Sequence, residues 1–441
     1  MTVQSAWLSR IGAAILLIVA VVAALCAAIW LPYFLARWLT NIPLLALVSV
    51  LTCVLIAWLG ARASARIWGA VRGARFASQT AGLLMLAFAV SLYWLILKPA
   101  PDPGNPPPFA TTRYWQLPTG SRIAYSEFDP PPGLTVKPDP VVFIHGGPGV
   151  RQAPFDQSIY GSLSKEGFRV FLYDQAGSGL SDFLPHVRDY TFKRMVDDLE
   201  AVRKQIGADK MIVIGHSWGS TLAAKYMATY PGHVSKVIFH APGDIWDWKN
   251  SFDYSRTDAP GFAATFPGVR FMAAMMLADR NPDAAENFVS QRELEGLSIP
   301  ILDAEFGTVV CKGNSNRLPP EIAAMRAAHE NPAMNPYVQR NIQFDNGDPH
   351  EALRKDPTPA ILLYPECNYV PWDGAVDYRK TLPNLKIYYI PHAGHYAQME
   401  QPDLMRRILV AFLLDQPDVL APVQGDEDPR LRPVAPIGSQ K

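Results

Sequence analysis

Two glycine-rich stretches of the sequence contain residues suited to nucleophilic catalysis, namely a serine between glycines and a loop with free backbone N–H groups. The stretch GHSWGS, residues 215–220, places Ser217 between glycines directly after the apolar run MIVI. Such glycines allow a sharp turn from strand to helix that exposes the serine at the end of a sheet. The stretch HGGPG, residues 145–149, also follows an apolar run. We predict that Ser217 is a nucleophile and that the backbone N–H groups of Gly147 and Trp218 form its oxyanion hole.

A serine nucleophile also needs a general base, and the stretch PHAGHYAQ near the C-terminus offers two histidines. His395 follows Gly394 and opens the final helix, so it can turn back toward Ser217. We predict that His395 is the base. We expect His392 to be a surface or supporting residue, and His216 to pack beside the nucleophile.

The elements around these stretches alternate between strand and helix. Short β-rich apolar runs, among them VVFI, MIVI and KIYYI, are separated by helical patterns. One such pattern has apolar residues at spacings of three and four between Phe192 and Ile206. This alternation predicts an α/β fold with a mostly parallel sheet and helices on both faces. The predicted catalytic residues all follow strands, where functional groups of such sheets collect.

The motifs HGGPG, DQAGSGLS, GHSWG and the C-terminal GH together resemble the α/β-hydrolase superfamily, and within it the proline iminopeptidase group of serine peptidases. The resemblance covers about residues 115–415 of a predicted hydrolase domain at 113–418. It implies a helical lid after the sixth strand, expected at about 245–355. It also implies the roles given above to Ser217, His395, Gly147 and Trp218, and it implies no metal or cofactor.

The acid of the triad is the point where the sequence departs from that group. The family position falls in the turn PECN, where Asn368 stands instead of Asp. An amide can orient the histidine but supplies no charge, and asparagine in place of the acid lowers turnover by about 10⁴ in a serine protease. Three explanations remain open: another carboxylate serves, Asn368 serves weakly, or catalysis is lost. We favour another carboxylate, Asp373 first and Asp244 second, with Glu366 as a third choice.

Lid residues are the candidates for substrate binding. Apolar side chains there can line a pocket or form the lid's own core, and acidic ones can bind the α-amine of a peptide or simply face solvent. The candidates are Phe262, Phe266, Phe271, Met275, Glu293, Glu295 and Glu305. They do not separate an aminopeptidase from an esterase.

The first 98 residues predict a membrane unit, because they contain seven Lys or Arg residues and no Asp or Glu. Uncharged runs at about 11–36, 42–61 and 76–97 are each near the length of roughly 20 residues that crosses a bilayer. We predict three transmembrane helices. The 62–75 loop carries four arginines and the preceding loop only Arg37. Positive loops stay cytoplasmic, so we expect a cytoplasmic N-terminus and a periplasmic or extracellular hydrolase domain.

Two Pro-rich stretches and the cysteines complete the organisation. Residues 99–112 are expected to form a stiff linker, and residues 419–441 a disordered tail. Cys311 and Cys367 are either two free buried thiols, which is the simpler interpretation, or a disulfide between the lid and the Asn368 turn.

The sequence thus predicts a membrane-anchored serine hydrolase that cleaves a small peptide, amide or ester through an acyl-enzyme. One alternative is a carboxylesterase or lipase-like enzyme, and another is a catalytically silent domain that binds a ligand or partner. Residues after position 98 carry 33 basic and 40 acidic side chains, which gives no indication of nucleic-acid binding.

Overall fold

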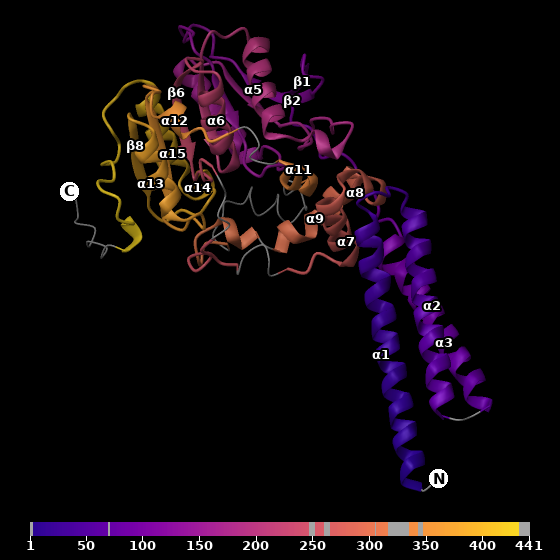
Figure 1. The fold of residues 1–441 in the computed structure, drawn as a ribbon. Helices are drawn as coiled ribbons and strands as arrows, with labels where there is room; N and C mark the ends of the chain where they lie inside the picture. Colours follow the sequence, from indigo (N-terminus) through magenta and orange to yellow (C-terminus); the bar gives the residue numbers. More distant parts are fainter. Residues whose placement is uncertain are drawn as a thin grey trace. The chain divides into compact units, whose positions relative to one another are not determined.

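The computed structural model describes residues 3–68, 71–246, 252–259, 265–304, 306–315, 335–342 and 347–431. The chain divides into two compact units, whose helices and strands are labelled in Figure 1. One comprises Met1–Pro101 and Pro267–Leu294, and is here called the helical unit. The other comprises Asp102–Phe266 and Glu295–Lys441, and is here called the hydrolase unit.

The hydrolase unit is built on one eight-stranded sheet of order β1-β2-β4-β3-β5-β6-β7-β8. β1 and β2 pair antiparallel, β2 pairs antiparallel with β4, and all other neighbours are parallel. This confirms the predicted sheet. The strands are β1 (Thr112–Gln116), β2 (Arg122–Phe128), β3 (Val141–Ile144), β4 (Val170–Tyr173), β5 (Met211–His216), β6 (Val234–His240), β7 (Ala360–Pro365) and β8 (Leu385–Ile390).

Helices cover both faces of this sheet, because the central strands are apolar on both sides. Val142 faces one apolar cluster and its neighbour Phe143 the opposite one, as the alternation along a strand requires. α5 (Phe192–Ile206), α6 (Trp218–Thr229), α12 (His350–Leu353) and α13 (Trp372–Thr381) pack on the first face, whereas α4 (Pro154–Gly161) and α15 (Pro402–Leu413) pack on the second. Shorter elements are η2 (Ser162–Glu166), η3 (Val187–Asp189), η4 (Phe306–Val309), α11 (Pro336–Asn341), α14 (Ala397–Glu400) and η5 (Pro429–Leu431).

The helical unit contains the apolar segments of the N-terminal region. They are α1 (Val3–Leu35), α2 (Ile42–Trp68), α3 (Val71–Leu92) and the π-helical turn η1 (Tyr93–Leu97). Within the described part of the chain, two stretches are long and apolar enough to span a membrane, Trp7–Leu35 and Ile42–Trp68. The third predicted span is shorter, with an apolar part at Ala81–Leu97.

Part of the predicted lid belongs to the helical unit, which the sequence did not indicate. α7 (Val269–Arg280), α8 (Pro282–Phe288) and the start of α9 (Gln291–Ala304) fall in it. Asn281 Nδ2 donates to the Ala36 carbonyl oxygen over 3.0 Å, and the Arg270 guanidinium donates to the Ile96 carbonyl oxygen. The expected lid at 245–355 is therefore not one body.

The predicted disordered tail is wrong over residues 419–431. The Val423 N–H donates to the Ile387 carbonyl oxygen over 2.7 Å, and Trp372 Nε1 donates to the Asp426 carbonyl oxygen over 2.8 Å. The Arg379–Asp426 ion pair, at 2.6 Å, adds a third attachment. A segment without periodicity is ordered here because β8 and α13 supply its partners. Residues 432–441 lie outside the described part of the chain.

Candidate active site

Ser217 occupies a strained turn between β5 and α6. Its backbone has φ 53° and ψ −119°, a region that residues other than glycine seldom adopt. A Cβ at Gly219 would collide with the Ile144 carbonyl oxygen, and a Cβ at Gly215 would collide with the carbonyl oxygen of Gly219. The Ser217 N–H donates to the His240 carbonyl oxygen over 2.9 Å, which holds the turn. Both glycines of the motif are therefore required by close packing, as a nucleophile turn demands.

The HGGPG loop passes directly beside this serine. A Cβ at Gly146 would lie only 3.0 Å from Ser217 Cβ, so a larger residue would press on the Ser217 side chain. Gly147 follows with φ 113°, and Trp218 is the first residue of α6. Both positions agree with the expected oxyanion hole, whose donors stay a prediction.

His395 lies in the loop between β8 and α14, and its ring is buried. Burial lowers the pKa of the His395 imidazole well below its usual value, and the charge of His216 lowers it further. The ring is therefore neutral at neutral pH, which is the form a general base requires. The Tyr369 ring lies 4.4 Å away, and His216 Nε2 lies 3.0 Å from the His395 carbonyl oxygen.

Asn368 takes the position of the acid, because its Oδ1 lies 2.7 Å from His395 Nδ1. The Val370 N–H donates to the same atom over 3.3 Å. Only an oxygen can accept from that N–H, so the atom that faces the ring is Oδ1 rather than Nδ2. His395 Nδ1 must therefore carry the proton, which leaves Nε2 as the acceptor for a serine hydroxyl.

The preference for another carboxylate is wrong in this structure. Asp373 is exposed in the first turn of α13. The Glu366 carboxylate accepts the His392 N–H over 2.8 Å, and Asp244 Oδ1 faces Gly374, 2.8 Å from where a Cβ on that glycine would lie. Among the described residues the hydrogen-bond partner of His395 Nδ1 is Asn368. The family position predicted from the sequence thus locates the residue, and the choice of a substitute was the error.

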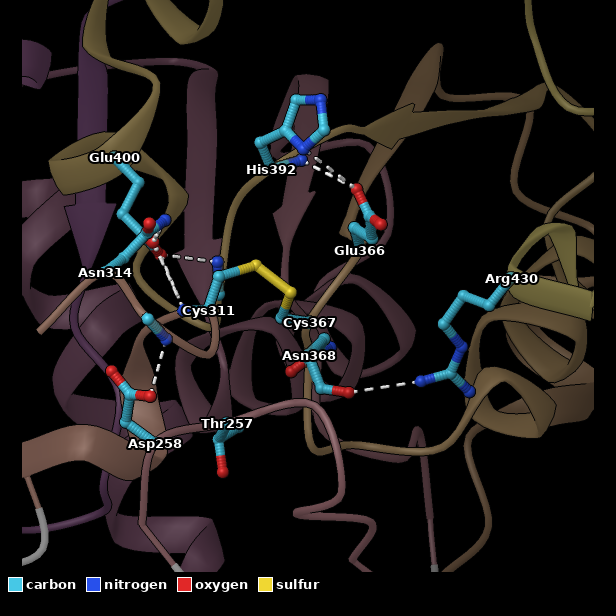
Figure 2. Close-up of a disulfide and its surroundings, with 12 residues drawn as sticks. Thr257, Asp258, Cys311, Asn314, Glu366, Cys367, Asn368, His392, Glu400 and Arg430 are labelled. Atoms are coloured by element: carbon cyan, nitrogen blue, oxygen red, sulfur yellow. Dashed lines mark hydrogen bonds and ion pairs between the residues drawn. A yellow bond between two sulfur atoms is a disulfide. The ribbon is translucent and has the colours of Figure 1, made fainter. Parts of the chain in front are cut away.

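A disulfide joins Cys311 to Cys367, with their Cα atoms 5.1 Å apart (Figure 2). The simpler interpretation of two free thiols is therefore wrong. Cys311 comes from the segment between β6 and β7, and Cys367 immediately precedes Asn368. The Cys367 N–H donates to the Ala393 carbonyl oxygen over 2.9 Å. The disulfide consequently fixes the Asn368 turn to a remote segment, and the backbone hydrogen bond joins it to the His395 loop.

The predicted substrate residues are scattered. Glu293 pairs with Arg270 at 2.6 Å and accepts the Ala100 N–H at 2.6 Å. A carboxylate engaged by both groups is not available for a substrate amine, so that prediction is wrong for Glu293. Phe271 and Met275 lie on α7 in the helical unit, and their pocket role stays a prediction, as does that of Phe266, whose side chain is exposed. Phe262 and Glu305 lie outside the described residues.

Three residues that support the Asn368 and His395 loops were not predicted from the sequence. Glu400 accepts the N–H of Gly394 over 2.6 Å and that of Cys311 over 3.2 Å, and burial raises the pKa of its carboxyl. Tyr369 covers the His395 ring, and Arg430 donates to the Asn368 carbonyl oxygen over 3.3 Å. Tyr369 and Glu400 lie close in sequence to the predicted site, which was a usable signal. Arg430 gave none, because its segment reads as a Pro-rich tail.

A family profile described as the alpha/beta hydrolase fold matches residues 139–402. The chain belongs to the α/β-hydrolase family. The match spans strands β3 to β8, and it therefore includes Ser217, Asn368 and His395 of this α/β-hydrolase.

Curated relatives of this α/β-hydrolase include proline iminopeptidases. The one from Heyndrickxia coagulans is 38% identical over 136 residues, covering 29% of this chain and 43% of the relative. The one from Xylella fastidiosa strain Temecula1 is 26% identical over 291 residues, covering 63% and 88%. The chain thus spans less than half the length of the first of these relatives. A solved proline iminopeptidase from Mycobacterium smegmatis has 19% identity and a TM-score of 0.46, covering 69% of this chain and 98% of that one.

Proposed function

We propose that the protein is a membrane-anchored serine hydrolase that cleaves a small peptide, amide or ester through an acyl-enzyme. The observation that carries the proposal is the ordered pair of His395 and Asn368, with Oδ1 held 2.7 Å from Nδ1. This pair leaves Nε2 as the proton acceptor, and the strained turn of Ser217 supplies the hydroxyl.

The proposed reaction uses these residues in two half-reactions. Ser217 Oγ attacks the substrate carbonyl carbon while its proton passes to His395 Nε2, and the N–H groups of Gly147 and Trp218 stabilise the oxyanion. The proton then passes from Nε2 to the leaving amine or alcohol, whose bond to the carbonyl carbon breaks. Water attacks the resulting ester and gives its proton to Nε2, and Ser217 leaves with that proton as the acid product departs.

Asn368 makes this a weakened triad rather than a broken one. In a serine protease the change from Asp to Asn lowers turnover by about 10⁴, and the wrong histidine tautomer is the cause. Here the Val370 N–H holds the amide so that the correct tautomer forms. The loss that remains is the missing negative charge beside the imidazolium.

Asn368 also favours the one rival function that a specific observation supports, a silent domain that binds a ligand or partner. Labelling with a fluorophosphonate separates the two, since the reagent needs an activated serine and no knowledge of the substrate. We expect the full-length protein to be labelled and the Ser217→Ala variant not to be. A folded wild-type protein that resists labelling at high reagent concentration would favour the rival.

The substrate class follows from the proline iminopeptidase relatives. We propose short peptides with a free N-terminus as first candidates, and simple esters as second. Turnover of proline and alanine arylamides against acetyl and butyryl esters, all compared with Ser217→Ala, ranks the two classes.

The apolar helices α1 and α2 support membrane anchoring. The four arginines within residues 62–75 support a cytoplasmic N-terminus and a hydrolase unit outside the cytoplasm. A reporter that is active only outside the cytoplasm tests this topology. It should be on when fused after residue 112 and off when fused within the arginine-rich region 62–75, which the sequence predicts as a loop and where the structure has the end of α2 and the start of α3. The reverse pattern would overturn the orientation.

A further inference from the structure

A carboxamide at the acid position must be held in one orientation, whereas a carboxylate need not be. Either oxygen of a carboxylate accepts the Nδ1–H, whereas a carboxamide does so in only one of its two orientations. In the flipped orientation Nδ2 would face the ring, His395 would have to accept at Nδ1, and Nε2 would carry the proton. That tautomer cannot take a proton from Ser217.

The orientation of the Asn368 carboxamide depends on the hydrogen bonds of its oxygen, Oδ1. Among the described residues Nδ2 has no hydrogen-bond partner, although the side chain is fully buried. The two donors at Oδ1, His395 and Val370, therefore decide which way the amide faces. Of these two, only the Val370 backbone N–H is a donor in every protonation state. The place of that N–H is consequently what selects the tautomer.

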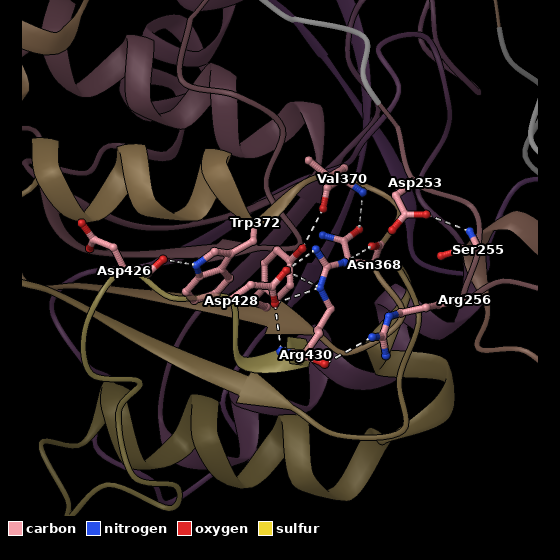
Figure 3. A network of polar contacts seen from close by, with 10 residues as sticks. Asp253, Ser255, Arg256, Asn368, Val370, Trp372, Asp426, Asp428 and Arg430 are labelled. Atoms are coloured by element: carbon pink, nitrogen blue, oxygen red, sulfur yellow. Dashed lines mark hydrogen bonds and ion pairs between the residues drawn. The ribbon is translucent and has the colours of Figure 1, made fainter. Parts of the chain in front are cut away.

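Arg430 holds the turn in which that N–H lies (Figure 3). Its Nη1 donates to the Asn368 carbonyl oxygen over 3.3 Å, and its guanidinium lies 5.4 Å from the centre of the Tyr364 ring. The Tyr364 hydroxyl donates in turn to the Val370 carbonyl oxygen over 2.8 Å. Arg430 thus contacts the turn at Asn368 directly and at Val370 through Tyr364.

The guanidinium is itself fixed. Asp428 binds its Nε and Nη2 at 2.9 and 2.7 Å, and only 8% of the Arg430 side chain is exposed. Arg256 donates to the Arg430 carbonyl oxygen over 3.3 Å. A bidentate, buried pair of this kind has one geometry and neutralises the charge that would otherwise oppose the imidazolium.

We propose that Arg430 is a positioning residue that selects the active orientation of the Asn368 carboxamide, and through it the catalytic tautomer of His395. This inference rests on the proposed hydrolase function. The C-terminal segment 426–431 would then have a positioning role that is needed only because residue 368 is an asparagine and not an aspartate.

The test is a double-mutant cycle in the full-length protein, read as the rate of fluorophosphonate labelling. Arg430→Ala should slow labelling by about tenfold or more in the wild-type background. In the Asn368→Asp background the same change should slow it less than about threefold, because a carboxylate has no wrong orientation. Equal losses in both backgrounds, or no loss in the first, would overturn the proposal.

Arg379→Ala is the matched control, because it breaks an ion pair that the same segment makes through Asp426, and in the described part of the chain Arg379 bonds Asp426 and Val423 rather than Asn368. It should leave the labelling rate nearly unchanged. Should Arg430→Ala fail to fold, Arg430→Gln provides the same comparison with one hydrogen bond retained.

A second readout needs no turnover. ¹⁵N NMR of histidine-labelled protein, with His395→Gln for assignment, reports which ring nitrogen carries the proton. We expect Nδ1–H in the wild type and a share of Nε2–H in Arg430→Ala. An unchanged tautomer would reject the role of Arg430 whatever the enzyme's activity, whereas a labelling failure of the wild type alone would reject the function.

Discussion

The turn that carries Ser217 and the turn that carries Asn368 are built in opposite ways. The first is made by consecutive residues, 215–220, whose glycines permit close contact with β3 and α6. The second is held by residues distant in sequence, Cys311 on one side and Arg430 on the other. The shape of the first turn is thus set mainly by its own glycines, whereas the second turn also depends on side chains more than 50 residues away.

Loss of the nucleophile is the largest expected effect in this comparison. Ser217→Ala should reduce turnover by about 10⁶, as removal of a triad serine does elsewhere. The strained backbone is kept, so the melting temperature should change little. Arylamide or ester hydrolysis together with a thermal melt measures both quantities. Residual labelling at another serine would show that the nucleophile was misassigned.

The acid turn should respond in the opposite direction to a restored charge. Asn368→Asp places a carboxylate 2.7 Å from His395 Nδ1, where it stabilises the imidazolium of the transition state. We expect turnover to rise by about two to three powers of ten, and Asn368→Ala to lower it. Steady-state kinetics of the three proteins decides this. A fall in Asn368→Asp would mean that the amide is required for another reason.

Removal of the disulfide tests how far Cys311 stabilises the Asn368 turn. The Cys311→Ser/Cys367→Ser variant should lose about 2–4 kcal/mol of unfolding free energy, because the 56-residue loop regains its freedom in the unfolded chain. The turnover number should also fall by several-fold, since Cys367 adjoins Asn368. Urea unfolding and kinetics measure the two effects. Cys26→Ser, a change at an exposed free cysteine, is the control.

Buried histidines predict a smaller effect of pH on stability. Burial lowers the pKa of His216 to about 4, and those of His240 and His395 well below the usual value of 6.5. The unfolded chain therefore binds more protons than the folded one between pH 6.5 and about 4. The contribution of these histidines to stability should be full above pH 6.5 and fall as the pH drops through that window, whereas Asp156, whose carboxyl pKa burial raises to about 7, contributes in the opposite direction. Thermal melts from pH 7 to 4 check the sign, and His216→Gln should flatten part of the slope.

Asp373→Asn should have the smallest effect. The side chain is exposed on α13, so turnover should stay within about twofold of the wild type. Losses as large as those of an acid deletion would restore Asp373 as the acid and contradict the contact of Asn368 with His395.

The contrast between contacts of adjacent residues and contacts of distant residues explains which features could be predicted from the sequence. The sheet, α5 and the Ser217 turn were predictable because each depends on residues adjacent in the chain, through periodicity or glycine spacing. The position of Asn368 followed from the strand that precedes it. Its partner Arg430 did not, because no local pattern records that a Pro-rich segment pairs with β8 and α13. The sequence could not decide between free thiols and a disulfide for the same reason, since the fold determines which cysteines come together.

The grouping of Pro267–Leu294 with the N-terminal helices bears on how the chain stays together when the Pro-rich stretch is cut. Leu277 and Ala284 pack with Ala36 and Leu45, and Asn281 binds the end of α1. A protease that cut the Pro-rich stretch at 99–112 would therefore sever the covalent connection without shedding the catalytic fragment. Truncation at that stretch would strip α7 and α8 of their apolar partners and yield an aggregating product instead of a soluble enzyme.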